Sequence, residues 1–169
     1  MPGVGTSMVR LGMNREELIK LWGEPADEYN HSGACKYSEI HWFPAVEKRE
    51  QTQGDGVFAF LRDGKVFEVR FGQGFHTPHG LAVNLTLGEL KTRTTGKMFE
   101  LTKSASTFTN DENLYFLIDS RRGVAFEIGT PYRGKQRIVS AIYVFYPESA
   151  FLPWGCIDGN QRLVELTNE

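Results

Sequence analysis

Apolar positions follow a helical spacing near the start of the chain and a strand-like spacing after about residue 37. Leu18, Leu21 and Trp22 form an i, i+3, i+4 stripe, which predicts a helix over residues 14–22. Asn14 suits the N-cap position, and Glu17 stands where a capping box requires an acid. The Gly-Glu-Pro sequence that follows favours the end of the helix.

The same arrangement returns 72 residues later in the chain. Thr86 suits a second N-cap, Glu89 occupies the capping-box position, and Gly96 is a candidate for the helix end. The interior residues 92–95 have low helix propensity, because three of the four are threonine. We therefore expect this second helix to be short or irregular.

Strand-like segments follow each helix. In the first half they span residues 37–43, 57–62 and 65–71, and in the second half 107–109, 114–119, 124–128 and 138–146. The strand at 66–71 corresponds to 139–144 at an offset of 73. The pattern predicts an α+β fold built from duplicated helix-then-antiparallel-meander units, 1–76 and 77–147, that form one sheet with helices on one face. Residues 148–169 are predicted to be an extension that packs on this sheet and contains a final strand.

The Asp63-Gly64 pair predicts a two-residue type I′ turn that sets the register of the first hairpin. Uninterrupted pairing from this turn gives a phenylalanine-rich face, expected under the helices: Phe58, Phe60, Phe67, Val69 and Phe71. The other face is expected to meet solvent or a partner, and it carries Val57, Ala59, Leu61, Val66, Glu68 and Arg70.

Charge and cysteine content narrow the class of protein. The chain has 19 Lys and Arg against 21 Asp and Glu, a net charge of −2, which argues against nucleic acid as the main partner. No run approaches the ~18 apolar residues of a membrane span, and the N-terminus does not resemble a secretory signal. Cys35 and Cys156 match no redox or zinc spacing, so two free thiols in the cytoplasm are expected, with a long-range disulfide as the alternative.

No group of residues indicates a catalytic site, a metal site or a cofactor. His76 and His79 are separated by a proline and have no nearby acid or cysteine, so a polar linker is the favoured interpretation. His31, Cys35 and His41 form a second candidate cluster for a metal site or a nucleophilic cysteine. A surface turn that leads into a strand is the favoured interpretation of this segment.

Two stretches resemble a known family. "LGMNREELIKLWGEP" is similar to the opening of the repeat in β-lactamase inhibitory proteins and in outer-membrane lipoproteins of the SmpA/OmlA type. "FHTPHGLAVNLTLGELKTRTTGK", followed by "GVAFEI" and "IVSAIYVF", resembles the second copy in tandem members. This resemblance implies a BLIP-like fold and a protein that binds other proteins, as an inhibitor or assembly subunit, through the open face of its sheet.

The preferred hypothesis is therefore a non-enzymatic protein-binding module, inhibitor- or immunity-like, that captures a protein on the open face of the sheet. Strand parity gives its candidate binding residues: Glu39, His41, Glu68, Arg70, Tyr115, Glu127 and Tyr143. The alternative is a small-molecule-binding protein or enzyme with a pocket between sheet, linker and C-terminal tail, which predicts an acid or histidine with a perturbed pKa. A structural subunit that buries the open face by self-association is a third hypothesis.

Overall fold

The computed structural model of the chain describes residues 9–33, 35–42, 56–72, 80–103, 114–129, 137–157 and 161–167. These residues form one antiparallel sheet of nine strands in the order β1-β2-β3-β4-β8-β7-β6-β5-β9. The strands are β1 Asp27–His31, β2 Tyr37–Trp42, β3 Val57–Arg62, β4 Lys65–Phe71, β5 Lys97–Lys103, β6 Leu114–Asp119, β7 Val124–Gly129, β8 Ile138–Phe145 and β9 Gln161–Glu165. The helices are α1 Arg15–Trp22, α2 Leu87–Arg93 and the short 3₁₀ helix η1 Pro153–Gly155. None of the helices within these ranges is long and apolar enough to cross a membrane.

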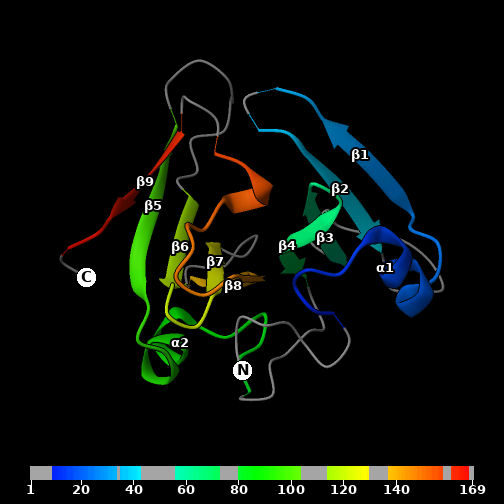
Figure 1. The fold of residues 1–169 in the computed structure, drawn as a ribbon. Coiled ribbons are helices and arrows are strands. Elements are labelled where there is room, and N and C mark those ends of the chain that lie inside the picture. The colour runs from blue at the N-terminus through cyan, green and yellow to red at the C-terminus, as the bar shows by residue number, and fades with distance from the viewer. Residues whose placement is uncertain are drawn as a thin grey trace.

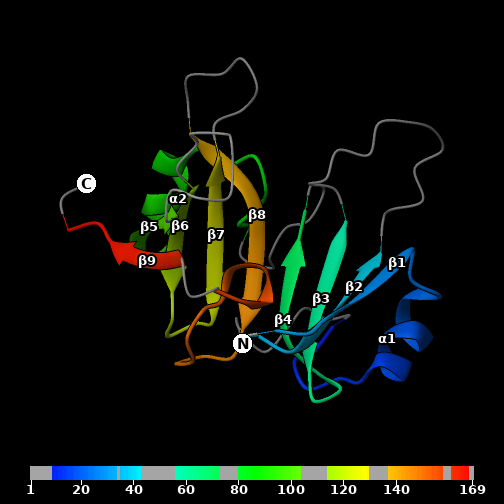
Figure 2. The same ribbon diagram turned by 90° about the horizontal axis from the view of Figure 1, so that it is seen from above.

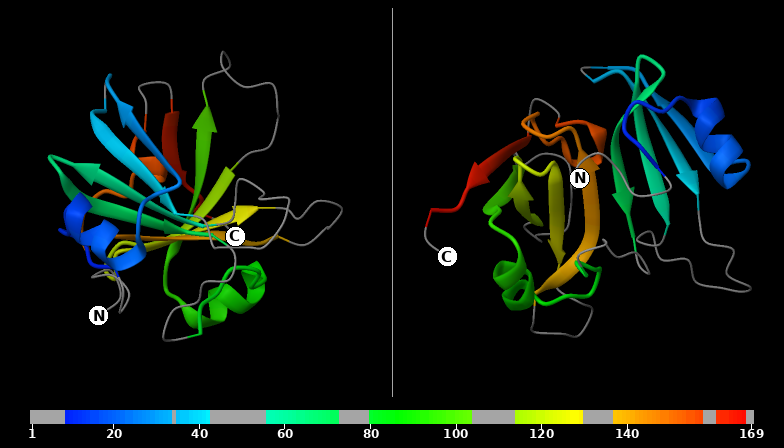
Figure 3. Two further views of the ribbon diagram at one scale, coloured as in Figure 1. Left: turned by 90° about the vertical axis from the view of Figure 1, so that its right-hand side faces the viewer. Right: turned by 60° about the horizontal axis from the view of Figure 1, so that its bottom comes forward.

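The sheet is strongly curved, and its two faces carry different elements. Helix η1 lies inside the curve, whereas α1 and α2 lie outside it (Figure 1). Strands β4 and β8 meet in the middle, with the strands of the first half on one side and those of the second half on the other (Figure 2). Each α-helix lies beside the strands of its own half (Figure 3). We call the η1 side the concave face and the α-helical side the convex face.

Helix α1 confirms the capping prediction. The Asn14 side chain accepts a hydrogen bond from Glu17 N (2.9 Å), and the Glu17 carboxylate accepts one from Asn14 N (2.8 Å). Gly23 closes the helix with φ +81°, a conformation that favours glycine, and its N–H donates to Ile19 O. These local interactions satisfy backbone groups that a helix leaves unpaired at its ends.

Helix α2 has the same capping box, formed by Thr86 and Glu89. The backbone N–H and hydroxyl of Thr86 lower the pKa of Glu89 below its ordinary value. The helix is short, as expected, but it ends at Thr94 rather than Gly96. Gly96 serves another purpose, because a Cβ there would overlap the side chain of Leu117.

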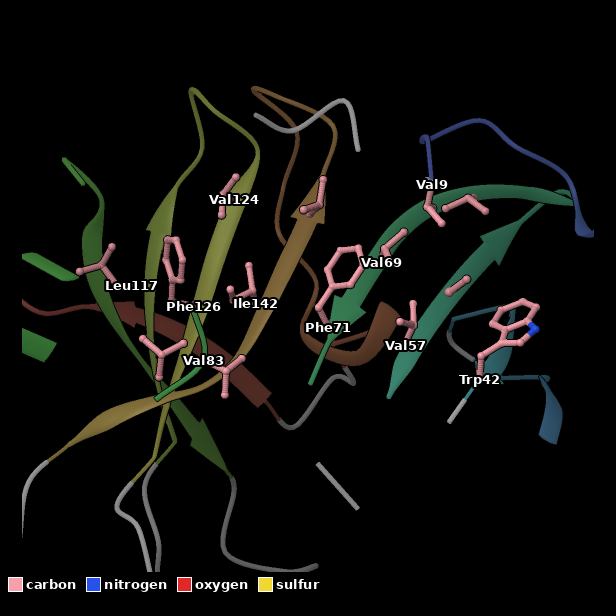
Figure 4. Close-up of a cluster of buried hydrophobic side chains, with 14 of the residues drawn as sticks. Val9, Trp42, Val57, Val69, Phe71, Val83, Leu117, Val124, Phe126 and Ile142 are labelled. Carbon is pink, nitrogen blue, oxygen red and sulfur yellow. The ribbon is translucent and has the colours of Figure 1, made fainter. Parts of the chain in front are cut away.

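The main hydrophobic core lies on the convex face. Leu18 of α1 and Leu90 of α2 are both fully buried in one cluster. Figure 4 shows strand residues of this cluster from both halves, among them Val57, Phe71 and Ile142. The strand residues of this cluster include Val57, Ala59, Leu61, Val66, Val69, Phe71, Leu117, Val124, Phe126, Ile128, Val139, Ile142 and Val144. Burial of this continuous apolar face supplies the main driving force for folding, and both helices cover the same side of the sheet.

The predicted register of the first hairpin is wrong beyond its first two pairs. A β-bulge interrupts the ladder, so Phe60 pairs with Glu68 rather than with Phe67. Since one extra residue exchanges the two faces of a strand, β3 is turned over relative to the prediction. Val69 and Phe71 lie in the convex core as expected, but Val57, Ala59, Leu61 and Val66, which were expected on the other face, lie there too. The phenylalanines expected under the helices, Phe58 and Phe60, therefore share the concave face with Glu68 and Arg70.

Two strands were not anticipated. All five residues of β1 are exposed, so its sequence lacks the apolar alternation that identifies a strand. Strand β5 carries lysines at both ends and pairs with β6 and β9. The predicted strand at 107–109, the boundary at residue 76, and His76 and His79 lie outside the described residues.

Candidate functional site

Strand parity predicted seven residues on the open face, and the structure brings six of them to the concave face. These are Glu39, His41, Glu68, Arg70, Glu127 and Tyr143. Tyr115 lies on the convex face instead, where it packs against the main core and the guanidinium of Arg137 lies 4.1 Å from its ring centre. Its neighbour Phe116 faces the concave side, opposite Glu127, as do Leu114 and Ile118 of the same strand.

The C-terminal segment, residues 148–157, covers the middle of the concave face (Figure 1). Phe151 is only 5% exposed, and its ring centre lies 5.2–5.4 Å from the rings of Phe116, Tyr143 and Phe145. Trp154 also packs against Phe116. The concave face of the second half is therefore a second hydrophobic core rather than an open surface.

Gly155 and a disulfide attach this segment to the first half. Gly155 has φ +77°, and a Cβ at this position would lie 2.8 Å from the Phe60 ring, so no larger residue fits without a shift of its neighbours. The next residue, Cys156, forms a disulfide with Cys35, with 5.8 Å between the Cα atoms. The expectation of free thiols is thus wrong. The two cysteines are 121 residues apart, and only the folded chain brings them together.

Glu68 lies beneath the C-terminal segment and is 1% exposed. Burial raises the pKa of this carboxyl well above its ordinary value, although the backbone N–H groups of Gly155 and Leu152 partly offset the effect. Gly155 N donates to Glu68 Oε1 at 3.2 Å. The raised pKa favours the neutral form of this carboxyl, and the segment above it blocks access from solvent.

Arg70, Tyr143 and Glu127 form a buried network that links β4, β8 and β7. Arg70 Nε donates to Tyr143 Oη (3.1 Å), and Tyr143 Oη donates to Glu127 Oε2 (2.7 Å). Ser140 donates to the other carboxylate oxygen of Glu127 at 2.9 Å. Burial opposes the charged form of Arg70, but Tyr143 and Glu127 outweigh it and raise its pKa. The pKa of Tyr143 is also raised, by burial and by the charge of Glu127. These residues are satisfied by one another within the sheet.

Beside the C-terminal segment, the concave face continues onto β1 and β2. We call this part the β1–β2 patch and define it as Tyr29, His31, Tyr37, Glu39 and His41. Tyr37 also contacts the segment, because a Cβ on Gly155 would lie 3.1 Å from its ring. Tyr29 pairs with Glu39 and His31 with Tyr37, so the five side chains share one face. The Tyr29 and His41 ring centres are 5.3 Å apart, and the His31 and Tyr37 rings are stacked at 4.3 Å. Tyr29 is 49% exposed.

Glu39 connects the two histidines of the patch. Its Oε1 lies 2.7 Å from His41 Nε2, and its Oε2 lies 3.1 Å from His31 Nε2. Partial burial opposes ionisation, but the bonds and charges of His41 and His31 prevail and lower the pKa of Glu39. The carboxylate is thus ionised, so each imidazole donates its Nε2 proton to it. Burial, together with the charge of Glu39, raises the pKa of Tyr37 to about 12, so this phenol stays neutral.

Tyr29, His31 and Tyr37 were not among the predicted binding residues. In the sequence, Tyr29 and His31 stand two positions apart, as Tyr37, Glu39 and His41 do. This spacing places all five on one face only if residues 27–31 form a strand that pairs with β2. Within the described ranges, no three His, Cys, Asp or Glu side chains are grouped so that they could hold a metal ion.

A hollow of about 730 Å³ lies at the end of the patch, between the β1–β2 and β3–β4 turns. Its lining includes His31, Lys36, Tyr37 and Arg62. The small-molecule alternative predicts a pocket that contains an acid or histidine with a perturbed pKa. Glu68, whose pKa is raised, does not line this hollow.

Comparison of the chain with protein-family models, with curated proteins and with solved structures finds no match. The concave face and its residues are therefore the basis on which a function is assigned.

Proposed function

We propose that this chain is a non-enzymatic protein-binding module, inhibitor- or immunity-like, that captures its partner with the β1–β2 patch. The observation that carries the proposal is the position of the C-terminal segment, which covers Glu68 and packs against Tyr143 but leaves Tyr29 and His31 of the patch exposed. Tyrosine combines a large apolar ring with a polar tip, a combination enriched where proteins meet. The contact surface is thus narrower than the whole concave face.

The chemistry of the concave face favours binding over catalysis. The acid with the most strongly raised pKa, Glu68, is enclosed by the C-terminal segment and cannot contact a substrate. The Glu39 side chain is 18% exposed, but its carboxylate is already bonded to two imidazoles and its pKa is lowered. A lowered pKa weakens a carboxylate as a base, whereas a fixed negative charge suits recognition.

We also infer that the two halves are copies of one helix-then-meander unit, as the BLIP-like resemblance implies. Val66 N donates to Met13 O, and Val139 N donates to Leu85 O, both at 2.8 Å. The second pair lies 73 and 72 positions after the first in sequence. Hairpins β3–β4 and β7–β8 each contain one β-bulge. In this interpretation the C-terminal segment covers the concave face of the second copy and Glu68 of the first, so a partner meets the concave face at β1 and β2 of the first copy.

The disulfide indicates the kind of cellular compartment in which the protein folds. Disulfides persist in oxidising compartments and are rare in the cytosol, where thiols are kept reduced. The Cys35–Cys156 bond therefore supports an oxidising compartment in place of the cytoplasm expected from the sequence.

The proposal is tested with two tyrosines of similar exposure on opposite faces. Tyr29 is 49% exposed in the patch, and Tyr146 is 44% exposed next to Gly12, outside it. Affinity capture followed by mass spectrometry identifies a partner, and calorimetry with the purified pair then gives its Kd. We expect Tyr29→Ala to raise the Kd about tenfold and Tyr146→Ala to change it less than about twofold. Equal effects of the two substitutions, in variants that unfold at similar temperatures, would reject the patch as the contact surface.

A small-molecule-binding protein or enzyme is the second candidate function. The hollow of about 730 Å³ beside the patch supports it, because this volume is in the range of ordinary ligand pockets. A compound library screened by thermal shift, followed by Arg62→Ala and by Arg93→Ala as a control outside the hollow, tests this alternative.

A further inference from the structure

The hollow beside the β1–β2 patch is lined by two cations, Lys36 and Arg62, which are both exposed. Among the residues that the structure describes, neither cation lies within ion-pair distance of a carboxylate. Asp63 is the one acid in the described part of the lining. Even without any charge on His31, the lining therefore has two cations against one acid, although the chain as a whole has a net charge of −2.

The acids of the adjoining concave face lie outside the hollow. Glu39 does not line it, and both carboxylate oxygens of Glu39 are bonded to imidazoles. Glu68 does not line it either, and the raised pKa of Glu68 favours its neutral form. The charge of Arg62 acts to lower that pKa but does not overcome the effect of burial. Arg62 therefore gains no anionic partner from Glu68.

Two of the donors in the lining are held in position by their neighbours. The guanidinium of Arg62 lies 4.5 Å from the centre of the Phe67 ring, a cation–π contact that restricts its rotation. The side-chain oxygen of Asn30 accepts from the Ser38 hydroxyl at 2.6 Å, so the two amide protons of Asn30 remain to donate elsewhere. Groups that are fixed before a ligand arrives lose little conformational entropy when they bind it.

We propose that the hollow binds an organic oxyanion, a carboxylate or phosphate group, with Lys36 and Arg62 as its counter-charges and the Asn30 amide as a further donor. A guanidinium binds either group through two parallel N–H donors, and an ammonium adds a compact positive charge. The volume of about 730 Å³ is in the range of small-molecule pockets. This inference rests on the second candidate function and adds the chemical class of the ligand to it.

The experiment compares charged and neutral probes of nearly the same shape. The ¹⁵N-labelled chain, with its disulfide intact, is titrated with benzoate, with phenyl phosphate and with benzamide, which resembles benzoate but is uncharged. We expect both anions to shift the backbone amide resonances of Ser32, Ser38 and Gly64 in a saturable manner, with a Kd in the millimolar range. Benzamide should leave these resonances unchanged. About 1 M sodium chloride should weaken binding of the anions severalfold, because it screens exposed charges.

Three single substitutions, each of which removes one positive charge, test the assignment. Lys36→Gln and Arg62→Gln should each weaken binding of benzoate about fivefold. Lys91→Gln, on the exposed surface of α2, changes the net charge by the same amount and should leave the Kd unchanged. All three positions are exposed, and ¹⁵N spectra of the variants verify that they fold like the parent chain. Equal affinity of Arg62→Gln and Lys91→Gln, or binding of benzamide as tight as that of benzoate, would overturn the proposal.

Failure of this inference and failure of the second candidate function give different results. If a neutral compound from the thermal-shift screen binds the parent chain but not Arg62→Ala, and benzoate does not bind, the hollow is a ligand pocket and the anionic class is wrong. If benzoate and phenyl phosphate bind as expected but no compound of the screen does, the oxyanion site stands and the small-molecule function is wrong.

Discussion

Replacement of Glu68 by glutamine tests whether a neutral carboxyl lies beneath the C-terminal segment. Glu68 is 1% exposed, and burial holds its pKa well above the ordinary value. Glutamine has nearly the same shape and keeps an oxygen that can accept the Gly155 N–H. The substitution therefore removes the ionisation of Glu68 and leaves its packing almost unchanged.

The sign of the effect follows from proton binding. An unfolded chain ionises glutamate near pH ~4.3, whereas the folded state keeps the Glu68 proton to a higher pH. Between these two pKa values the folded state binds more protons, so the free energy of unfolding falls by about 1.4 kcal/mol for each pH unit. The fall ends when the pH passes the folded-state pKa. At pH 7 we expect Glu68→Gln to be more stable than the parent chain, by on the order of 1 kcal/mol or more.

Urea unfolding at pH 4.5, 6 and 8, with the disulfide intact, measures this difference. The advantage of Glu68→Gln should grow from pH 4.5 to pH 8 and should appear in calorimetry as about 2–4 °C in Tm for each kcal/mol. Glu16→Gln, at an exposed position on α1, is the matched control and should show no such trend. A difference that stays constant with pH, or that reverses at pH 8, would refute the neutral, buried carboxyl.

Two further predictions concern the attachment of the C-terminal segment. Replacing Cys35 and Cys156 together by serine should lower the free energy of unfolding by about 2–4 kcal/mol in denaturant titrations, because the bond closes a long loop of the unfolded chain. Reduction of the parent chain should give the same value, and an unchanged midpoint would contradict the bond. Gly155→Ala should destabilise the chain by about 2–3 kcal/mol, because its Cβ meets the Phe60 ring. Gly64→Ala is its control, since Gly64 has a similar φ of +73° but no atom within 4 Å, and should cost only about 1 kcal/mol. Equal losses in the two variants would show that the contact with Phe60 has no effect.

Local interactions are what the amino-acid order alone determines in this protein. Both capping boxes form between residues three positions apart, so Asn14 with Glu17 and Thr86 with Glu89 are readable without knowledge of the fold. The first hairpin turn is likewise local, and Asp63 adopts the positive φ that a type I′ turn requires. Parity along one strand is local too, which is why six of the seven predicted binding residues share a face.

Contacts between segments far apart in the sequence could be identified only from the folded chain. The bulge at Phe67 exchanges the two faces of β3 relative to β4, and nothing in its neighbouring residues signals where the ladder slips. Strand β1 exists because β2 pairs with it, not because of an apolar pattern.

The accessibility of the site also depends on contacts between segments that are far apart in the sequence. Phe151 could have packed elsewhere, but the Cys35–Cys156 bond and the fit of Gly155 hold its segment over one half of the concave face. Burial is a property of the whole assembly of strands, so the order of residues cannot specify which acids remain exposed.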